Sequence, residues 1–155
     1  ETLVGWRNRL FSSSRFRRFA ERIPGLRRIA RREAAAMFDL CAGFVYSQIL
    51  FACVRLGVFE FLADGPRTAR DLAHQSRLPR ESALRLLDAA SALGLVESLG
   101  GERYALGPRG VIVLANPGIS AMIEHHALLY QDLADPITLL RDPDAPTRIG
   151  RYWAY

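Results

Sequence analysis

The sequence predicts a mainly α-helical domain with one small β-hairpin, and three observations lead to this fold class. Apolar residues recur at helical spacing, most clearly between residues 79 and 93. A long apolar segment covers residues 37–56, and two short strand-like segments, LVESL and RYAL, flank Gly100 and Gly101. With 155 residues, half of them hydrophobic and 24% charged, the chain suits one globular domain.

Residues 63–107 are expected to follow the order helix, turn, helix, hairpin. Thr68 and Asp71 have the spacing of a capping box, which would open a short helix. A second helix should follow Pro79 and end at Gly94, since apolar residues recur at helical spacing, at Ala83, Leu86, Leu87, Ala90 and Leu93. This order predicts a winged helix. Many DNA-binding proteins contain this unit, but a fold alone does not determine function.

The charges of this unit argue against DNA binding. The exposed side of the second helix should carry Arg80 and Arg85 but also Glu81 and Asp88, a net charge of zero. Between residues 65 and 110 there are seven Arg against five acidic residues, so few phosphates could be neutralised. We therefore expect a packing role and no nucleic-acid partner.

The positive charge of the chain is concentrated in a basic arm, residues 1–32. This arm has ten Arg against two Glu, a net charge of +8, whereas the other 123 residues carry −3. Apolar residues such as Phe16, Phe19 and Ile23 lie among the arginines, and a break is expected near Pro24 and Gly25. Arginines mixed with bulky apolar residues suit peripheral contact with a membrane. The alternatives are a solvated arm or one that packs on a neighbouring subunit, and attraction of RNA or DNA by the same charge.

The second predicted domain, residues 33–155, begins with one long apolar helix, an interruption at Gly57 and a short helix. The uncharged run between Asp39 and Arg55 has fifteen residues, whereas a membrane span needs about 20. We expect a buried helix, and since its apolar residues face nearly every direction, a partner subunit should cover it. The predicted homodimer interface consists of Phe38, Phe44, Tyr46, Ile49, Leu50 and Phe51.

The remaining segments give fewer signals. A further helix is expected over residues 117–141, divided or kinked at Pro136, followed by a loop-like ending. Cys41 and Cys53 would lie roughly 18 Å apart on one helix, too far for a disulfide. Without a recognisable secretory leader, the expected location is the cytoplasm.

Catalytic motifs are not found in this sequence. It has no GxGxxG, P-loop or nucleophile elbow, and the only histidine pair, His125 and His126, is adjacent and cannot chelate one metal from a helix. We therefore predict no catalytic, cofactor-binding or metal-binding residues in the chain. Either histidine could be a surface or core residue, or a polar group that faces a substrate.

Taken together, these segments resemble a known family. The stretches FDLCAGFVYSQILFACVRLGVFEFLADGPRTARDLA and LPRESALRLLDAASALGLVE, with the hairpin ending YALGPRG, resemble the N-terminal dimerisation region of class I S-adenosylmethionine-dependent O-methyltransferases. The arginine-rich start makes the chain most similar to bacterial carotenoid methyltransferases of the hydroxyneurosporene or demethylspheroidene type. The resemblance covers residues 37–155.

The resemblance implies a function for this region within an enzyme. The catalytic domain that binds S-adenosylmethionine would follow downstream, so the chain alone is expected to be inactive. Its role would be dimerisation and lining of a pocket for a hydrophobic substrate, an acyclic carotenoid with a hydroxyl group. By position, the pocket-wall residues would be Met122, His125, His126 and Tyr130, with Phe44 and Tyr46 as additions. The alternatives are a winged-helix transcriptional regulator and a freestanding adaptor.

Overall fold

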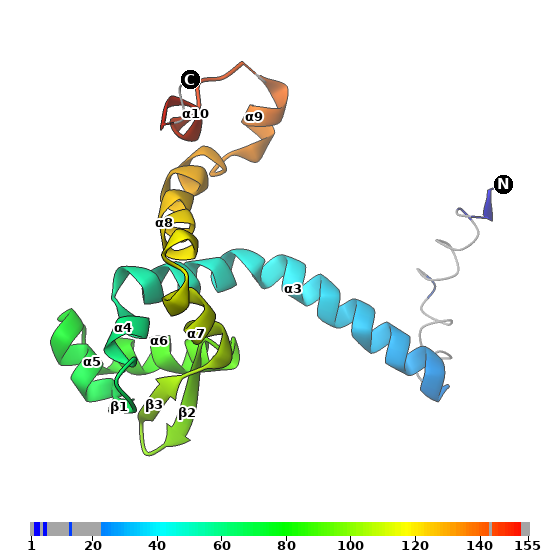
Figure 1. Cartoon of the computed structure of the whole chain (residues 1–155). Helices are drawn as coiled ribbons and strands as arrows, with labels where there is room; N and C mark the ends of the chain where they lie inside the picture. Colours follow the sequence, from blue (N-terminus) through cyan, green and yellow to red (C-terminus); the bar gives the residue numbers. More distant parts are fainter. Residues whose placement is uncertain (1, 4, 6–12, 14–22, 143, 153–155) are drawn as a thin grey trace. The chain divides into compact units, whose positions relative to one another are not determined.

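The computed structural model describes residues 2, 3, 5, 13, 23–142 and 144–152. Of the basic arm, residues 1, 4, 6–12 and 14–22 therefore lie outside the described residues. The chain divides into two compact units, Glu1–Phe44 and Val45–Tyr155, and each is described by itself. Figure 1 labels the elements in chain order, from α3 to α10.

Helix α3 spans Pro24–Arg55 and contributes to both units. Pro24 occupies the first helical position, where its missing N–H is tolerated. The helix runs without a break across the predicted domain boundary at residues 32 and 33. It ends as predicted before Gly57, whose φ of 63° requires the left-handed conformation that glycine adopts readily, and α4, Val58–Phe61, follows.

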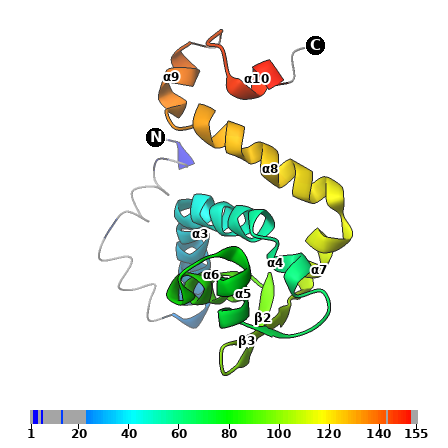
Figure 2. The ribbon, with the colours of Figure 1, turned by 90° about the vertical axis from the view of Figure 1, so that its left-hand side faces the viewer.

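The predicted winged helix is confirmed in the second unit. Helix α5, Ala69–Ser76, begins with the predicted capping box: the Asp71 backbone N–H donates to the Thr68 hydroxyl at 3.2 Å, and the Thr68 N–H donates back to the Asp71 carboxylate at 3.1 Å. Helix α6, Arg80–Ala92, follows Pro79 and packs on α5. Figure 2 shows α5 and α6 beside the sheet that forms the wing.

The wing is an antiparallel sheet with the strand order β1-β3-β2. Strands β2, Val96–Gly100, and β3, Arg103–Leu106, form the predicted hairpin. The third strand, β1, Arg67–Thr68, was not predicted, because two residues are too short to give an alternating pattern. Gly100, Gly101 and Glu102 all have positive φ, so the turn extends one residue beyond the predicted glycine pair.

The chain after the wing forms four further helices among the described residues. They are α7, Pro108–Ala115; α8, Pro117–Asp132; α9, Pro136–Arg141; and α10, Arg148–Tyr152. Pro136 divides the predicted helix as expected. The loop-like ending was a wrong prediction, because residues 148–152 form α10, which packs on α8.

The hydrophobic core lies within the winged-helix unit. Its largest fully buried side chains come from α3, α4, α5, α6, the sheet and the loop after α4: Tyr104, Phe59, Leu62, Leu72, Leu87, Val58, Val96 and Cys53. Helix α6 buries Ala83, Leu87 and Ala90, so its predicted apolar face is the one that contacts the core. This core positions the wing against α6 and α7.

Candidate functional site

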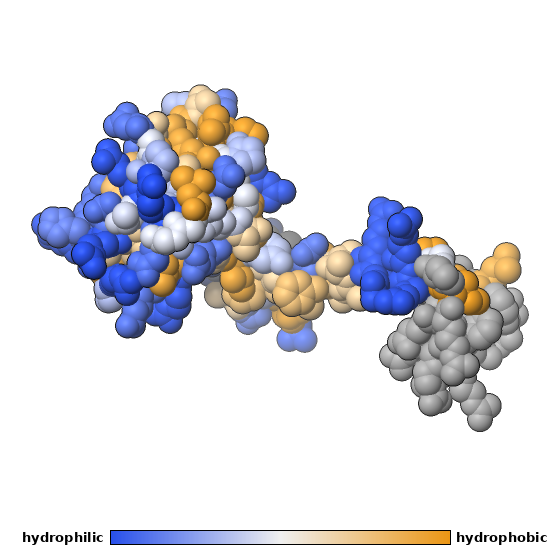
Figure 3. Space-filling model, turned by 90° about the horizontal axis from the view of Figure 1, so that it is seen from below, coloured by the Kyte–Doolittle hydropathy of each residue, from blue (hydrophilic) through white to orange (hydrophobic). Residues whose placement is uncertain are grey.

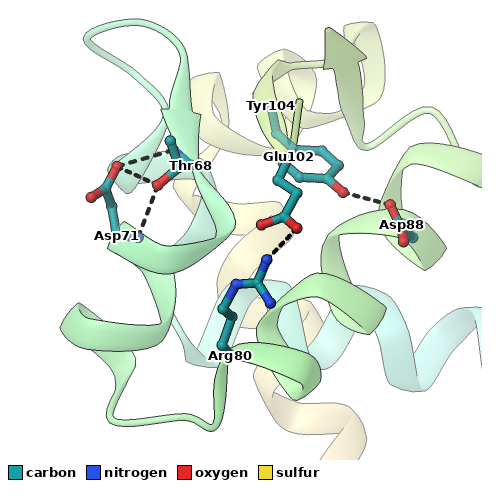
Figure 4. A network of polar contacts seen from close by, with 6 residues as sticks. All are labelled: Thr68, Asp71, Arg80, Asp88, Glu102 and Tyr104. Atoms are coloured by element: carbon teal, nitrogen blue, oxygen red, sulfur yellow. Dashed lines mark hydrogen bonds and ion pairs between the residues drawn. The ribbon is translucent and has the colours of Figure 1, made fainter. Parts of the chain in front are cut away.

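Two polar side chains of α6, Arg80 and Asp88, contact the wing (Figure 4). The Arg80 guanidinium forms an ion pair with the Glu102 carboxylate at the wing turn. The Tyr104 hydroxyl donates a hydrogen bond of 2.5 Å to Asp88, whose side chain also belongs to α6. Arg80 is one of the two arginines that a DNA-reading helix would need, and here it holds the wing against the helix. These contacts support the predicted packing role.

Helix α3 exposes a long apolar surface. Met37 is 60% exposed, Phe38 66%, Leu40 77% and Phe44 69%, although a soluble helix normally buries such side chains. Residues 37, 40 and 44 follow one another at intervals of three and four, so they lie on one face of the helix. These side chains are exposed in the single chain, whereas the sequence prediction was that a partner subunit covers the helix.

The six predicted interface residues fall into two groups. Phe38 and Phe44 are exposed. Ile49, Leu50 and Phe51 are half-buried and pack against the core of their own chain, and Tyr46 is also half-buried. The N-terminal part of the predicted interface is therefore available to a partner, whereas the C-terminal part already contributes to the fold. Met37 and Leu40 belong to the predicted dimer helix, residues 37–56, and are exposed as well.

Gly25–Arg55 is also long and apolar enough to cross a membrane by length and composition, and little of its apolar part is buried. A span must nevertheless keep charges out of the hydrocarbon. The run between Asp39 and Arg55 would cover roughly 22 Å, less than the roughly 30 Å of a bilayer core. A protein partner therefore suits this helix better than a membrane-spanning position.

The predicted pocket-wall residues lie along one side of α8. Met122, His126 and Tyr130 are spaced by four residues, and His125 lies one position before His126. Met122 is 54% exposed, whereas the other three are half-buried. The ring centroids of His126 and Tyr130 are 5.9 Å apart. Met122, His126 and Tyr130 thus share one side of α8.

Helix α10 covers part of α8. His125 Nε2 lies 3.1 Å from the Tyr152 hydroxyl, and the two ring centroids are 4.9 Å apart. The Arg148 and Ile149 backbone N–H groups each donate to the Asp132 carboxylate at 2.9 Å. These hydrogen bonds, from Ile149 first and Arg148 second, hold the pKa of Asp132 below its usual value. Asp132 and Tyr152 carried no sequence signal, because their partners lie 16 to 27 residues away.

The described residues do not fit a methyl-donor cofactor or a metal. Nucleotide-like cofactors bind where a parallel strand meets a glycine-rich turn and a helix. The described strands are all antiparallel, and no group of three His, Cys, Asp or Glu among the described residues could hold a metal ion.

Residues 38–116 match the family of O-methyltransferase dimerisation domains, and the match covers both the apolar helix and the winged helix. The chain belongs to this family. The chain is 44% identical over 147 residues to the demethylspheroidene O-methyltransferase of Cereibacter sphaeroides. This alignment covers 95% of the chain and 38% of that enzyme. The chain thus spans well under half the length of this relative.

Solved structures support the same assignment for the dimerisation domain. Mitomycin 7-O-methyltransferase superposes with a TM-score of 0.68 and is 25% identical, over 76% of this chain and 37% of the other. Human N-acetylserotonin methyltransferase, solved in complex with S-adenosylmethionine, superposes with a TM-score of 0.62 and is 27% identical, over 71% of this chain and 34% of the other. Neither these similarities nor the described structure favours a DNA-binding regulator.

Proposed function

We propose that this chain is the dimerisation and pocket-wall region of an S-adenosylmethionine-dependent O-methyltransferase that acts on a hydroxyl group of an acyclic carotenoid. The observation that carries the proposal is the 44% identity to demethylspheroidene O-methyltransferase along 95% of the chain. A cytoplasmic location belongs to the same proposal, since Cys41 and Cys53 are both free thiols.

The proposed partner for dimerisation is a second copy of the chain. The apolar side chains that α3 exposes, from Met37 to Phe44, would be removed from water in a homodimer. Stable interfaces of this kind bury upward of about 2,000 Å² in total, and a long apolar helix can supply much of that area. The family description of a dimerisation domain supports this assignment.

The proposed contribution to the reaction is a dry wall for the substrate. S-adenosylmethionine supplies the methyl group that is transferred to the hydroxyl oxygen, and the cofactor would be held outside the described residues. The proposed acceptor is the tertiary 1-hydroxyl of an acyclic carotenoid. Such an alcohol is poorly acidic, so exclusion of water and orientation of the hydroxyl matter for the reaction. Met122, His126 and Tyr130 would contact the apolar chain of the substrate, and Tyr152 would orient the His125 ring.

An enzyme chimera tests the proposed function. The 147 residues of the Cereibacter sphaeroides enzyme that align with this chain are replaced by the chain itself. The chimera should dimerise and should methylate demethylspheroidene with S-adenosylmethionine. A dimeric, folded chimera that does not methylate this substrate but methylates a small phenol would contradict the carotenoid assignment.

Substitutions on α8 in the same chimera test the wall. His126→Ala and Met122→Asp should raise KM for the carotenoid about tenfold or more, because each removes or disrupts apolar contact with the substrate. Glu124→Ala is the matched control, since Glu124 is exposed on the same helix but outside the proposed face. Equal kinetics for all three variants would show that this side of α8 does not face the substrate.

A further inference from the structure

The first turns of α3 carry a cluster of four exposed arginines, Arg27, Arg28, Arg31 and Arg32. At 100° per residue, their side chains leave the helix within a sector of roughly 140°. None of the four forms an ion pair with any residue in 23–142 or 144–152. Four guanidinium groups are thus concentrated on one side of about two helical turns.

The opposite side of the same turns is apolar. Ile23 is 37% exposed and Ile29 57%, and Leu26 is half-buried. At 100° per residue, Leu26, Ile29 and Ala30 leave the helix outside the sector of the arginines, and Ile23 lies just before the first residue of the helix. Figure 3 shows a compact hydrophilic band at the N-terminal end of α3 beside apolar surface. Residues 24–32 therefore form an amphipathic start of α3, with a cationic side and an apolar side, and Ile23 precedes them.

We propose that residues 23–32 bind the surface of membranes that contain anionic phospholipids. The helix would lie along the bilayer, with Ile23, Leu26 and Ile29 at the boundary between headgroups and acyl chains. The arginines would contact lipid phosphates, which a guanidinium can bind through two parallel hydrogen bonds. This inference goes beyond the proposed transferase function and does not depend on it.

Two observations favour a lipid surface over a nucleic acid. Contact with nucleic acid needs positive charge but leaves Ile23 and Ile29 in water, whereas a lipid interface takes up both sides of the helix. The segment also precedes residue 38, where the match to the dimerisation domain begins. In the proposed dimer the second copy would cover residues 37–44, a segment of α3 separate from residues 23–32.

The experiment measures co-sedimentation of the 155-residue chain with vesicles. Vesicles with roughly 30% phosphatidylglycerol in phosphatidylcholine should pellet the chain at low salt, and pure phosphatidylcholine should pellet it weakly. Each arginine near an anionic surface strengthens binding roughly fivefold, so replacing all four of Arg27, Arg28, Arg31 and Arg32 by Gln should weaken partitioning by about a hundredfold or more. The matched control replaces four exposed arginines elsewhere by Gln: Arg70, Arg85, Arg103 and Arg141.

Equal losses in the two quadruple variants would overturn the proposal, since net charge alone would then explain binding. Tighter binding of a DNA or RNA oligomer than of anionic vesicles, lost when Arg27, Arg28, Arg31 and Arg32 are replaced by Gln, would also overturn it.

A fluorescence experiment tests the apolar side of the helix. It uses the Ile29→Trp variant of a chain whose Trp6 and Trp153 are replaced by Phe. Blue-shifted emission, quenched by lipids brominated near the headgroup, is expected, whereas unshifted emission would exclude insertion. Sedimentation equilibrium of the variants reports dimerisation separately.

Discussion

At the scale of single residues, Gly107 and Gly110 allow α7 to approach the start of β2 closely. A Cβ atom at Gly110 would lie 2.2 Å from the Leu95 carbonyl oxygen, and one at Gly107 would lie 2.6 Å from the Gly94 carbonyl oxygen. The Gly107 N–H donates to the Leu95 carbonyl at 3.1 Å, so the two segments are joined by a hydrogen bond at the point of contact. Any side chain here would separate α7 from the sheet.

Gly110→Ala should therefore destabilise the fold by about 1–3 kcal/mol, because the added methyl group meets backbone that cannot move independently. Urea unfolding measures the free energy of unfolding. Gly118→Ala is the control, since nothing lies within 4 Å of a Cβ atom at Gly118. It should leave stability unchanged or slightly raised. Similar losses in both variants would contradict the close approach.

The raised pKa of Tyr104 makes the stability of the fold depend on pH in the alkaline range. Burial first, and then the hydrogen bond to Asp88, raise the pKa of Tyr104 from 10.0 to about 12. Because the folded pKa lies above the unfolded one, this contribution to stability is complete below about pH 10 and is lost as the pH rises toward 12. Tyr104→Phe should be less stable near neutral pH and should lose less stability between about pH 10 and 12. Parallel stability curves for the two proteins would be inconsistent with this titration.

At the scale of elements, the capping box joins β1 to α5. Thr68 belongs to β1 and is also the N-cap of α5, so one residue ends the strand and begins the helix. Hydrogen bonds from the Thr68 side chain first, and then from its backbone N–H, hold the pKa of Asp71 below its usual 3.8. The ionised carboxylate therefore stabilises the cap above that value, and the contribution is lost as the pH falls through the lowered pKa.

Thr68→Ala should cost about 1 kcal/mol of stability, because the Asp71 N–H loses its acceptor and the carboxylate loses a donor. Thr68→Ser is the control that retains the hydroxyl. Urea unfolding at neutral pH measures the difference between the two variants. If both variants were equally destabilised, the loss would come from the methyl group of Thr68 and not from the cap.

At the scale of the whole molecule, the main consequence of the fold is that α3 leaves apolar surface without cover from the described chain. Leu50 and Phe51 pack against their own core, so charged substitutions there should unfold the domain and would not isolate dimerisation. Leu40 is better suited to that purpose, since it is 77% exposed and lies between Met37 and Phe44 on the same face.

Leu40→Asp should convert the proposed dimer to a folded monomer at micromolar concentration, because it places a charge in an apolar interface. The control is Leu140→Asp on α9, where the wild-type side chain is 78% exposed. Sedimentation equilibrium measures the mass, and circular dichroism confirms folding. A wild-type chain that sediments as a monomer, or a Leu40→Asp variant that remains dimeric, would exclude this face as the interface.

The sequence alone was sufficient for elements whose signals are local. The capping box at Thr68, the end of α3 before Gly57, the hairpin at Gly100 and the division at Pro136 all follow from residues within a few positions of one another. Resemblance to O-methyltransferases, given by the same segments, was confirmed by the family match. The roles of Met122, His125, His126 and Tyr130 remain predictions, because residue types on one helix do not reveal what faces them.

Only the tertiary structure decided features that depend on distant partners. Strand β1 exists because Arg67 and Thr68 pair with β3, and α10 is capped by Asp132 from another helix. Burial likewise depends on packing: Phe38 and Phe51 are both apolar residues of α3, yet one is exposed and the other contacts the core. Local sequence determines helices and turns through nearby hydrogen bonds and conformational preference. Which apolar side chains remain for a partner depends on how the rest of the chain packs.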